Sequence, residues 1–314
     1  MNKIIVLPSV VAGLFVSLFV SFFVPLAYAE NNAAPAAAQA TSVTHRGTLY
    51  RIRHPGGTAW LFGTVHVGTP EFSSLGPEAM QALAASSRIA LELDVRDDAA
   101  FQSALQKYGL YSGNDGLNAH LSAATLALLR VELNRAGVPY ANVGRMKPWL
   151  LANLLVALQL ERAGYERRNG VETWLAAQAE SKPLHELESA DYQMSLFDGM
   201  SEADQEQYLR EQLAELGSGE TLRRSRELIS AWAAADSKAQ ERVMTEELSE
   251  KTLSADFMRR TLLAKRNPEM ATRIEDLLKK EGDAFVAVGL LHLLGENGIP
   301  ALLQRRGYKV EKVY

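Results

Sequence analysis

The sequence contains no cysteine among its 314 residues. This absence excludes a lipid-modified N-terminal cysteine, a disulfide framework, a thiolate nucleophile and any zinc site built from cysteine. An apolar core must therefore hold the folded chain together without covalent cross-links. If the protein binds a metal ion, its ligands are histidine, aspartate or glutamate.

The chain also lacks an excess of basic residues. It has 33 Lys and Arg against 37 Asp and Glu, whereas a nucleic-acid-binding face needs clustered cations. We therefore expect no nucleic-acid partner. The sequence contains no Gly-rich phosphate loop, no serine nucleophile elbow and no His-Glu-x-x-His helix. An apolar fraction of 47 % predicts an ordinary globular protein with a large core.

The N-terminus has the three parts of a signal peptide over residues 1–29. Lys3 precedes an apolar run over 4–24, and a small-x-small cleavage site follows at 27–29. This pattern predicts a periplasmic or secreted protein whose mature chain begins at Glu30. The alternative is an uncleaved anchor, because the apolar run is long enough to span a bilayer. Contact with a membrane is expected only in that case.

Downstream of the signal, residues 30–46 are rich in Ala, Asn and Gln, which predicts a flexible linker. Strand and helix patterns alternate at both ends of the region 47–314, which predicts one α/β domain. Residues 201–267 are charged, rich in Ala and Leu and nearly free of Pro and Gly, so we expect a helical insert there. The motif at 266–268 (Arg-Asn-Pro) is expected to end one helix, and 269–281 to form another.

Two of the six histidines follow a repeated pattern. One apolar run ends on Gly63-x-x-His66, and another ends on Gly289-x-x-His292. Each run predicts a buried strand, and each strand is followed by a helix and a further strand. A histidine just beyond a strand, after a glycine, is well placed as a ligand or general base. A lone histidine there is more often structural, but the repetition in two similar units favours a shared site.

A third predicted strand, over 88–95, carries Glu92 near its carboxyl end, where open α/β sheets place their ligands. Together with His66 and His292, this carboxylate forms the donor set of a catalytic metal ion that keeps an open position for water. The same residues without a metal can perform general acid and base catalysis. A shared ion would need both imidazoles within about 2.0 to 2.1 Å of it, so their separation is decisive.

Several segments resemble the TraB/GumN family, which is related to the TIKI proteins. They are LFGTVHVG, LELD, the Gly-Val-Glu element at 170–172, Leu-Glu at 187–188 with Gln193, Arg-Asn at 266–267, and AVGLLHLLGENGIPALLQRRGYKV. The resemblance spans 47–314. It implies an α/β fold like that of the erythromycin-esterase and ChaN-like proteins, with a mixed central sheet flanked by helices. It also implies a metal-dependent peptidase that uses a divalent ion such as Mn, Co or Zn.

Carried over onto this sequence, the resemblance makes His66, Glu92 and His292 the metal ligands. The Arg266-Asn267 pair joins the site, and Arg266 would stabilise an oxyanion. An alternative for Arg266 is a pairing with a structural carboxylate.

Glu172 and Glu188 are candidates for acid-base work or for support of the ligands. Each has a structural alternative. Glu172 follows Asn169 by three residues and could complete a capping box. Glu188 could cap the helix that contains Gln193.

The tripeptide Lys147-Pro148-Trp149 has two interpretations. Proline suits the first turn of a helix, with the tryptophan packed beneath it. Because the family has a similar basic-Pro-Trp element, Trp149 is alternatively part of a pocket wall.

The sequence therefore predicts an exported metal-dependent hydrolase, most simply a peptidase, that acts on a peptide or small-molecule substrate. A second hypothesis is a non-catalytic periplasmic protein of the same fold that captures a peptide or saccharide. In a third, the helical insert docks a partner protein and the histidines are structural.

Overall fold

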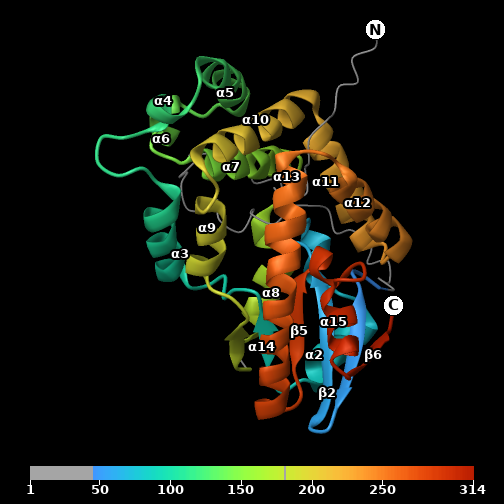
Figure 1. Ribbon diagram of the computed structural model, residues 1–314. Coiled ribbons are helices and arrows are strands. Elements are labelled where there is room, and N and C mark those ends of the chain that lie inside the picture. Colours follow the sequence, from blue (N-terminus) through green and yellow to red (C-terminus); the bar gives the residue numbers. More distant parts are fainter. Residues whose placement is uncertain (1–44, 180–181) are drawn as a thin grey trace.

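The computed structural model describes residues 45–179 and 182–314 (Figure 1). The signal peptide predicted for 1–29, and all of the linker predicted for 30–46 except its last two residues, lie outside the described residues. Within the described part, no helix is both long and apolar enough to cross a membrane.

Six strands of the described chain form a single sheet in the order β4-β3-β5-β2-β1-β6. The strands are β1 Leu49–His54, β2 Gly57–Thr64, β3 Ile89–Leu91, β4 Leu184–Glu186, β5 Phe285–Gly289 and β6 Lys309–Lys312. The four strands from β4 to β2 run parallel to one another, whereas β1 is antiparallel to both of its neighbours. The predicted mixed α/β sheet is thus confirmed.

The two strands that precede the histidines lie side by side at the centre of the sheet. β2 continues through α2 (Pro77–Ala85) to β3, and β5 continues through α15 (Ile299–Arg305) to β6. Each is a crossover between parallel strands, so the two units are similar, as predicted. The register pairs Thr64 with Gly289, so the glycines of the two Gly-x-x-His motifs are offset by one residue.

β5 shows why the sheet is buried on both faces. Phe285 and Ala287 enter a large core on one face, whereas Val286 and Val288 enter a smaller core on the other. The smaller core lies under α14 (Arg266–Glu281) and α15. A continuous apolar run without polar alternation is typical of a parallel strand covered by helices on both sides.

Helices surround the sheet and gather above it in Figure 1. The remaining α-helices are α3 Asp98–Ala104, α4 Leu117–His120, α5 Ala123–Ala136, α6 Tyr140–Val143, α7 Pro148–Arg162, α8 Val171–Gln178, α9 Ala190–Asp198, α10 Glu202–Ser218, α11 Glu220–Ala233, α12 Ser237–Ser249 and α13 Leu253–Phe257. Short 3₁₀ segments are η2 Pro70–Ser73, η4 Arg167–Asn169 and η7 Leu290–Leu293, and π-helical segments are η3 Leu105–Gly109 and η6 Met258–Lys265. Trp232 of α11 joins these helices to the sheet, since its indole N–H donates to the carbonyl of Gly63 over 2.8 Å.

The expected helix break at 266–268 is wrong. The π-helical segment η6 runs directly into α14, and Lys265 at the junction keeps right-handed helical backbone angles. Pro268 therefore lies in the first turn of α14. A proline, which has no N–H to donate, is tolerated near a helix start, and the wider π-helical turn before it relaxes the carbonyl positions that its ring would meet.

The strand predicted over 88–95 is also shorter than expected. β3 ends at Leu91, so Glu92 is the first residue beyond it. The buried side chains of Leu91 and Leu93 anchor the chain on both sides of this carboxylate.

Candidate active site

The three residues predicted to meet do lie together at the carboxyl edge of the parallel strands. His66 follows β2, Glu92 follows β3 and His292 follows β5. Their exposed fractions are 6 %, 3 % and 0 %. Glu92 Oε1 lies 3.7 Å from His292 Nε2. A Cβ atom built on Gly289 would lie 3.2 Å from Glu92 Oε1 and 3.5 Å from His66 Nε2, so the three side chains surround this glycine.

Gly289 has a direct part in this arrangement. Its N–H donates to Glu92 Oε1 over 2.6 Å. A side chain at this position would crowd the same oxygen. The glycine of the second motif thus lets the end of a strand approach a buried carboxylate closely.

The hydrogen bonds of His292 define which ring nitrogen carries the proton. The backbone carbonyl of Asn297 accepts from Asn267 Nδ2 over 2.8 Å, which turns Asn267 Oδ1 toward His292 Nδ1 at 2.5 Å. Because an amide oxygen only accepts, Nδ1 bears the hydrogen and Nε2 presents its lone pair on the side of Glu92. Burial, and then the nearby Arg266 cation, hold the pKa of His292 well below its usual value, so the imidazole is neutral.

His66 is held in a corresponding way by a different partner. Its Nδ1 lies 2.8 Å from Glu172 Oε1, and the Thr64 hydroxyl donates to the same oxygen. Burial acts to lower the pKa of His66, but the Glu172 carboxylate and, more weakly, Glu92 outweigh it and raise the pKa above its usual value. With Nδ1 directed at Glu172, Nε2 is turned toward Gly289.

This contact replaces the capping role considered for Glu172. The N-cap of α8 is Gly170, and Asn169 is the last residue of the 3₁₀ turn before it. Asn169 is therefore not the N-cap, and Glu172 is the second residue of α8, one position before the third residue that a capping box uses. Its side chain is 3 % exposed and belongs to the His66 site.

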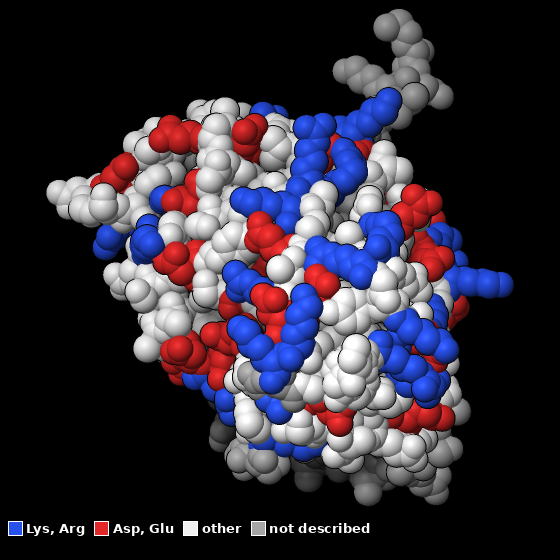
Figure 2. All heavy atoms as spheres, turned by 60° about the horizontal axis from the view of Figure 1, so that its bottom comes forward, with Lys and Arg blue, Asp and Glu red and all other residues white. Residues whose placement is uncertain are grey.

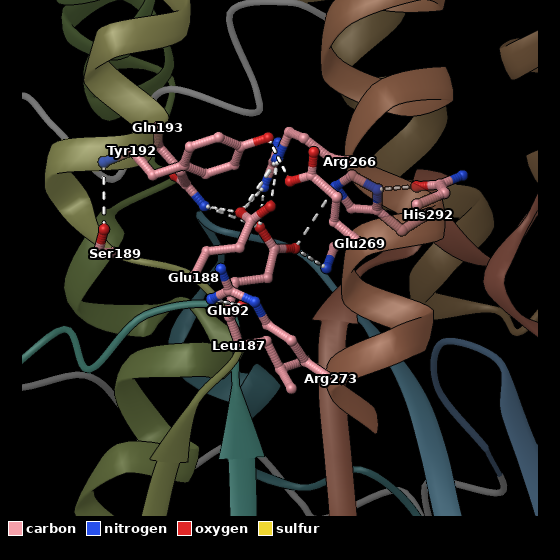
Figure 3. Close-up of polar contacts among 12 residues, drawn as sticks. Glu92, Leu187, Glu188, Ser189, Tyr192, Gln193, Arg266, Glu269, Arg273 and His292 are labelled. Carbon is pink, nitrogen blue, oxygen red and sulfur yellow. Dashed lines mark hydrogen bonds and ion pairs between the residues drawn. The ribbon is translucent and has the colours of Figure 1, made fainter. Parts of the chain in front are cut away.

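A buried edge cluster, composed of Glu92, Glu188, Gln193 and Arg266, lies beside the histidines (Figure 3). Arg266 Nη2 contacts Glu92 Oε2 at 2.7 Å and Glu188 Oε2 at 2.6 Å, and its Nε donates to Glu188 Oε1 over 3.0 Å. Gln193 Nε2 donates to Glu188 Oε2 over 2.7 Å and to Glu92 Oε2 over 3.3 Å. Every carboxylate oxygen of this cluster thus accepts a hydrogen bond.

Arg266 is therefore paired with carboxylates, as its structural alternative proposed. Burial opposes its charge, but Glu188 and Glu92 outweigh this effect and raise its pKa, so the guanidinium stays charged. The suggested helix-capping role of Glu188 is wrong. Ser189 is the N-cap of α9, where its hydroxyl accepts from the N–H of Tyr192.

Sequence reasoning missed three contributors to the site. Gln193 appeared only as part of a family motif. The second contributor is the contact between Tyr192 and Glu269, which joins α9 to α14 with an O···O distance of 2.6 Å. No sequence pattern indicated this contact. Thr64, the third contributor, could have been found from the sequence, because it lies two residues before His66 and so points to the same side of an extended chain.

Among the described residues, no group of three His, Asp or Glu side chains stands at the spacing of a formed metal site. The donor chemistry nevertheless fits a divalent ion. Ligating histidines usually give their other ring N–H to an oxygen, as His66 does to Glu172 and His292 to Asn267. Glu92 and Glu188 share the guanidinium of Arg266, whereas Glu172 contacts His66.

This combination defines a class of protein: an α/β sheet whose parallel strands end at a buried centre of two histidines and paired carboxylates. The chain belongs to the TraB/PrgY/gumN family, whose profile matches residues 48–312. It is also 23 % identical over 274 residues to a protein of Treponema pallidum (strain Nichols) described as an uncharacterized protein, covering 84 % of this chain and 82 % of that protein. No solved structure matches the chain.

Proposed function

We propose that this protein is an exported hydrolase, most simply a peptidase, whose centre consists of His66, Glu92 and His292 with a divalent cation. The observation that carries the proposal is the orientation of the two imidazoles. Each Nδ1 faces an oxygen acceptor, so that both Nε2 atoms are presented around Gly289 next to Glu92.

In this proposal His66, His292 and Glu92 would hold the cation, with the Nε2 atoms and Glu92 Oε1 on the side of Gly289. When bound, a divalent ion supplies a water molecule of lowered pKa at an open coordination position. Arg266 and Gln193 hold Glu92 through its other oxygen, Oε2. Oε1 thereby stays turned toward Gly289 and His292.

The carboxylate of Glu172 has the complementary role at His66. It holds the ring and favours a proton on Nδ1, so that the Nε2 lone pair of His66 would stay directed at the cation. Asn267 fixes His292 in the neutral form that presents a lone pair. The two imidazoles thus have different partners, a carboxylate and an amide, but each partner holds its ring so that Nε2 faces the proposed centre.

Substrate access requires the covering helices to move. The residues of the centre are at most 6 % exposed, and the hydrogen bond from Tyr192 to Glu269 joins α9 to α14 beside Arg266 (Figure 3). Separation of these two helices would break that contact and open a path to the carboxylates.

The test compares the mature protein, beginning at residue 30, with the variants His66→Ala and His292→Ala. We expect both variants to lose bound Mn, Co or Zn, measured by elemental analysis, and to hydrolyse a mixed peptide library about 10²- to 10⁴-fold more slowly. His54→Ala is the matched control, because His54 lies at the opposite end of β2, next to the hairpin turn. Unchanged turnover in both site variants would sink the proposal, whereas peptide binding without turnover would identify a binding protein instead.

A further inference from the structure

A polar cavity of about 670 Å³ lies at the other end of α9 from the edge cluster. Gln193 of α9 contacts Glu92, whereas Asp198, the last residue of the same helix, lines the cavity. Their separation of five positions corresponds to about 7.5 Å along the helix axis. The volume is within the range of pockets that hold small ligands, about 300 to 1,000 Å³.

The walls of this cavity carry both signs of charge, since Lys107, Arg145 and Lys147 line it together with Asp115, Asp198 and Glu202. Arg145 is exposed, and its Nη2 donates to the carbonyl of Tyr111 over 2.8 Å, which holds the guanidinium at the wall. Lys147 lines the cavity next to Pro148, the first residue of the 15-residue helix α7, and its ammonium pairs with Asp198. A helix start adds a partial positive charge to that of the lysine.

His120 also lines the cavity, where Asp115 and Glu202 lie 2.8 Å and 3.4 Å from its ring nitrogens. Its ring stacks on Tyr111 with centroids 4.2 Å apart. The hydrogen bond with Asp115 raises the pKa of His120, which favours its charged form.

These contacts resolve the two interpretations of the Lys147-Pro148-Trp149 motif. Trp149 is fully buried and stacks on Phe197 at 5.2 Å, so it packs under the helix and is no part of a pocket wall. Its neighbours Lys147 and Pro148 face the cavity instead.

A buried hydrogen-bond acceptor also lines the cavity. Gln205 is 6 % exposed, and its Nε2 donates to the carbonyls of Asp198 and Met200. This fixes the amide, and Gln205 Oε1 has no hydrogen-bond partner among the residues that the structure describes. Leaving a buried acceptor unsatisfied is costly, so a ligand that donates an N–H here would be favoured.

We propose that this cavity binds the C-terminal end of a short peptide. The peptide carboxylate pairs with Arg145, and a peptide N–H donates to Gln205 Oε1. Inorganic phosphate offers the negative charge without an N–H, and a C-terminal amide offers the N–H without the charge. The site requires binding alone, so it does not depend on the hydrolysis proposed for the histidine centre.

The test titrates the mature protein with alanine tripeptide as the free acid and as its C-terminal amide, by calorimetry. A hydrogen-bonded ion pair contributes about 1.5 to 3 kcal/mol, so we expect the amide to bind about 10- to 100-fold more weakly than the acid. Arg145→Gln should weaken binding of the acid to a similar degree. Arg130→Gln, an exposed arginine on α5 that does not line the cavity, should leave it unchanged.

Binding of the acid should persist in His292→Ala, which separates this site from the histidine centre. The comparison of the peptide acid with the peptide amide uses the unmutated protein, so misfolding of a variant does not affect it. Equal affinity for acid and amide, or no saturable binding of the acid, would overturn the proposal. Saturation by inorganic phosphate with no binding of either peptide would also overturn it, in favour of a simple anion site.

Discussion

Two buried groups of charges, one at the sheet edge and one among the helices above it, each contain an arginine that faces several glutamates. In the edge cluster, all four carboxylate oxygens of Glu92 and Glu188 accept hydrogen bonds from Arg266, Gln193 or the N–H of Gly289. The second group, the bundle cluster, comprises Glu215, Glu220, Arg224, Glu247 and Glu250.

In the bundle cluster, Arg224 pairs with Glu220, Glu247 and Glu250. Glu215 is fully buried, and neither of its carboxylate oxygens has a hydrogen-bond partner among the described residues. Burial, and then the charge of Glu247, raise its pKa to about 10. Glu215 is therefore protonated at neutral pH.

The difference shows that a perturbed carboxyl pKa does not by itself mark a site of chemistry. The edge cluster orients its carboxylates by donors from several strands and helices, and it presents one of them to two histidines. In the bundle cluster, Glu215 is protonated, which removes the cost of burying a charged carboxylate. Burial alone therefore does not distinguish the candidate active site. What distinguishes it is that its buried carboxylates all accept hydrogen bonds and lie next to two histidines.

The sharpest way to break this comparison is to remove the arginine of the edge cluster. Arg266→Met leaves Glu92 and Glu188 buried without their cation, which typically costs about 3 to 5 kcal/mol. Urea unfolding measures the loss. Arg223→Met is the control, because Arg223 pairs with Glu220 and Glu227 at the exposed edge of α11 and should cost under about 1 kcal/mol. Equal losses in the two variants would contradict the distinction.

A second prediction concerns the tautomer of His292. Asn267→Leu removes the acceptor of Nδ1 and leaves the carbonyl of Asn297 without its donor. Loss of such an orienting partner typically costs about 10- to 100-fold in metal affinity or activity. Metal affinity and peptide hydrolysis should both fall, while circular dichroism shows a retained fold. Full activity in a folded Asn267→Leu protein would remove the argument from imidazole orientation.

A third prediction tests the bundle cluster by pH. The pKa of Glu215 is raised from 4.5 when unfolded to about 10 when folded. The folded state then binds more protons between these values, so the free energy of unfolding falls as the pH rises, by at most about 1.4 kcal/mol per pH unit. Glu215→Gln removes this slope, and its stability relative to the wild type should rise steadily from pH 5 to pH 9. Parallel pH profiles of the two proteins in urea unfolding would refute the raised pKa.

The smallest predicted change in the free energy of unfolding comes from removing one hydroxyl group in each region. Thr64→Val removes the hydrogen bond to Glu172 and should cost about 1 kcal/mol. Ser225→Ala removes a buried hydroxyl that has no partner among the described residues, and it should be neutral or stabilising. Urea unfolding of both variants checks the contrast, and a larger loss from Ser225→Ala would reverse it.

Much of the fold could be read from the pattern of residues. Runs such as 285–289 are apolar throughout because both faces of that strand are buried, and such runs are visible without coordinates. The exact ends of the helices and strands were harder to predict from the sequence. The continuous helix through Pro268 depends on a π-helical turn, which amino-acid propensities do not encode, and β3 ends at Leu91 because of pairing with β4 and β5.

The candidate site likewise contains residues that the sequence could predict and roles that it could not. His66, Glu92 and His292 could be predicted because each follows a strand, and the carboxyl ends of parallel strands meet at one edge. The roles of Glu172, Glu188 and Arg266 could not be separated from capping and structural pairing. Those roles depend on which distant partner packs against each side chain.

The sequence by itself determined the absence of cysteine chemistry, the mixed α/β architecture and the two Gly-x-x-His motifs that converge on Gly289. Only the tertiary structure decided which buried glutamates are paired and which is left without a partner, and which nitrogen each histidine presents. The physical reason is that strand burial follows from local apolar periodicity. Hydrogen-bond partners, by contrast, are set by packing between segments that lie far apart in the chain, such as Glu92 with Arg266.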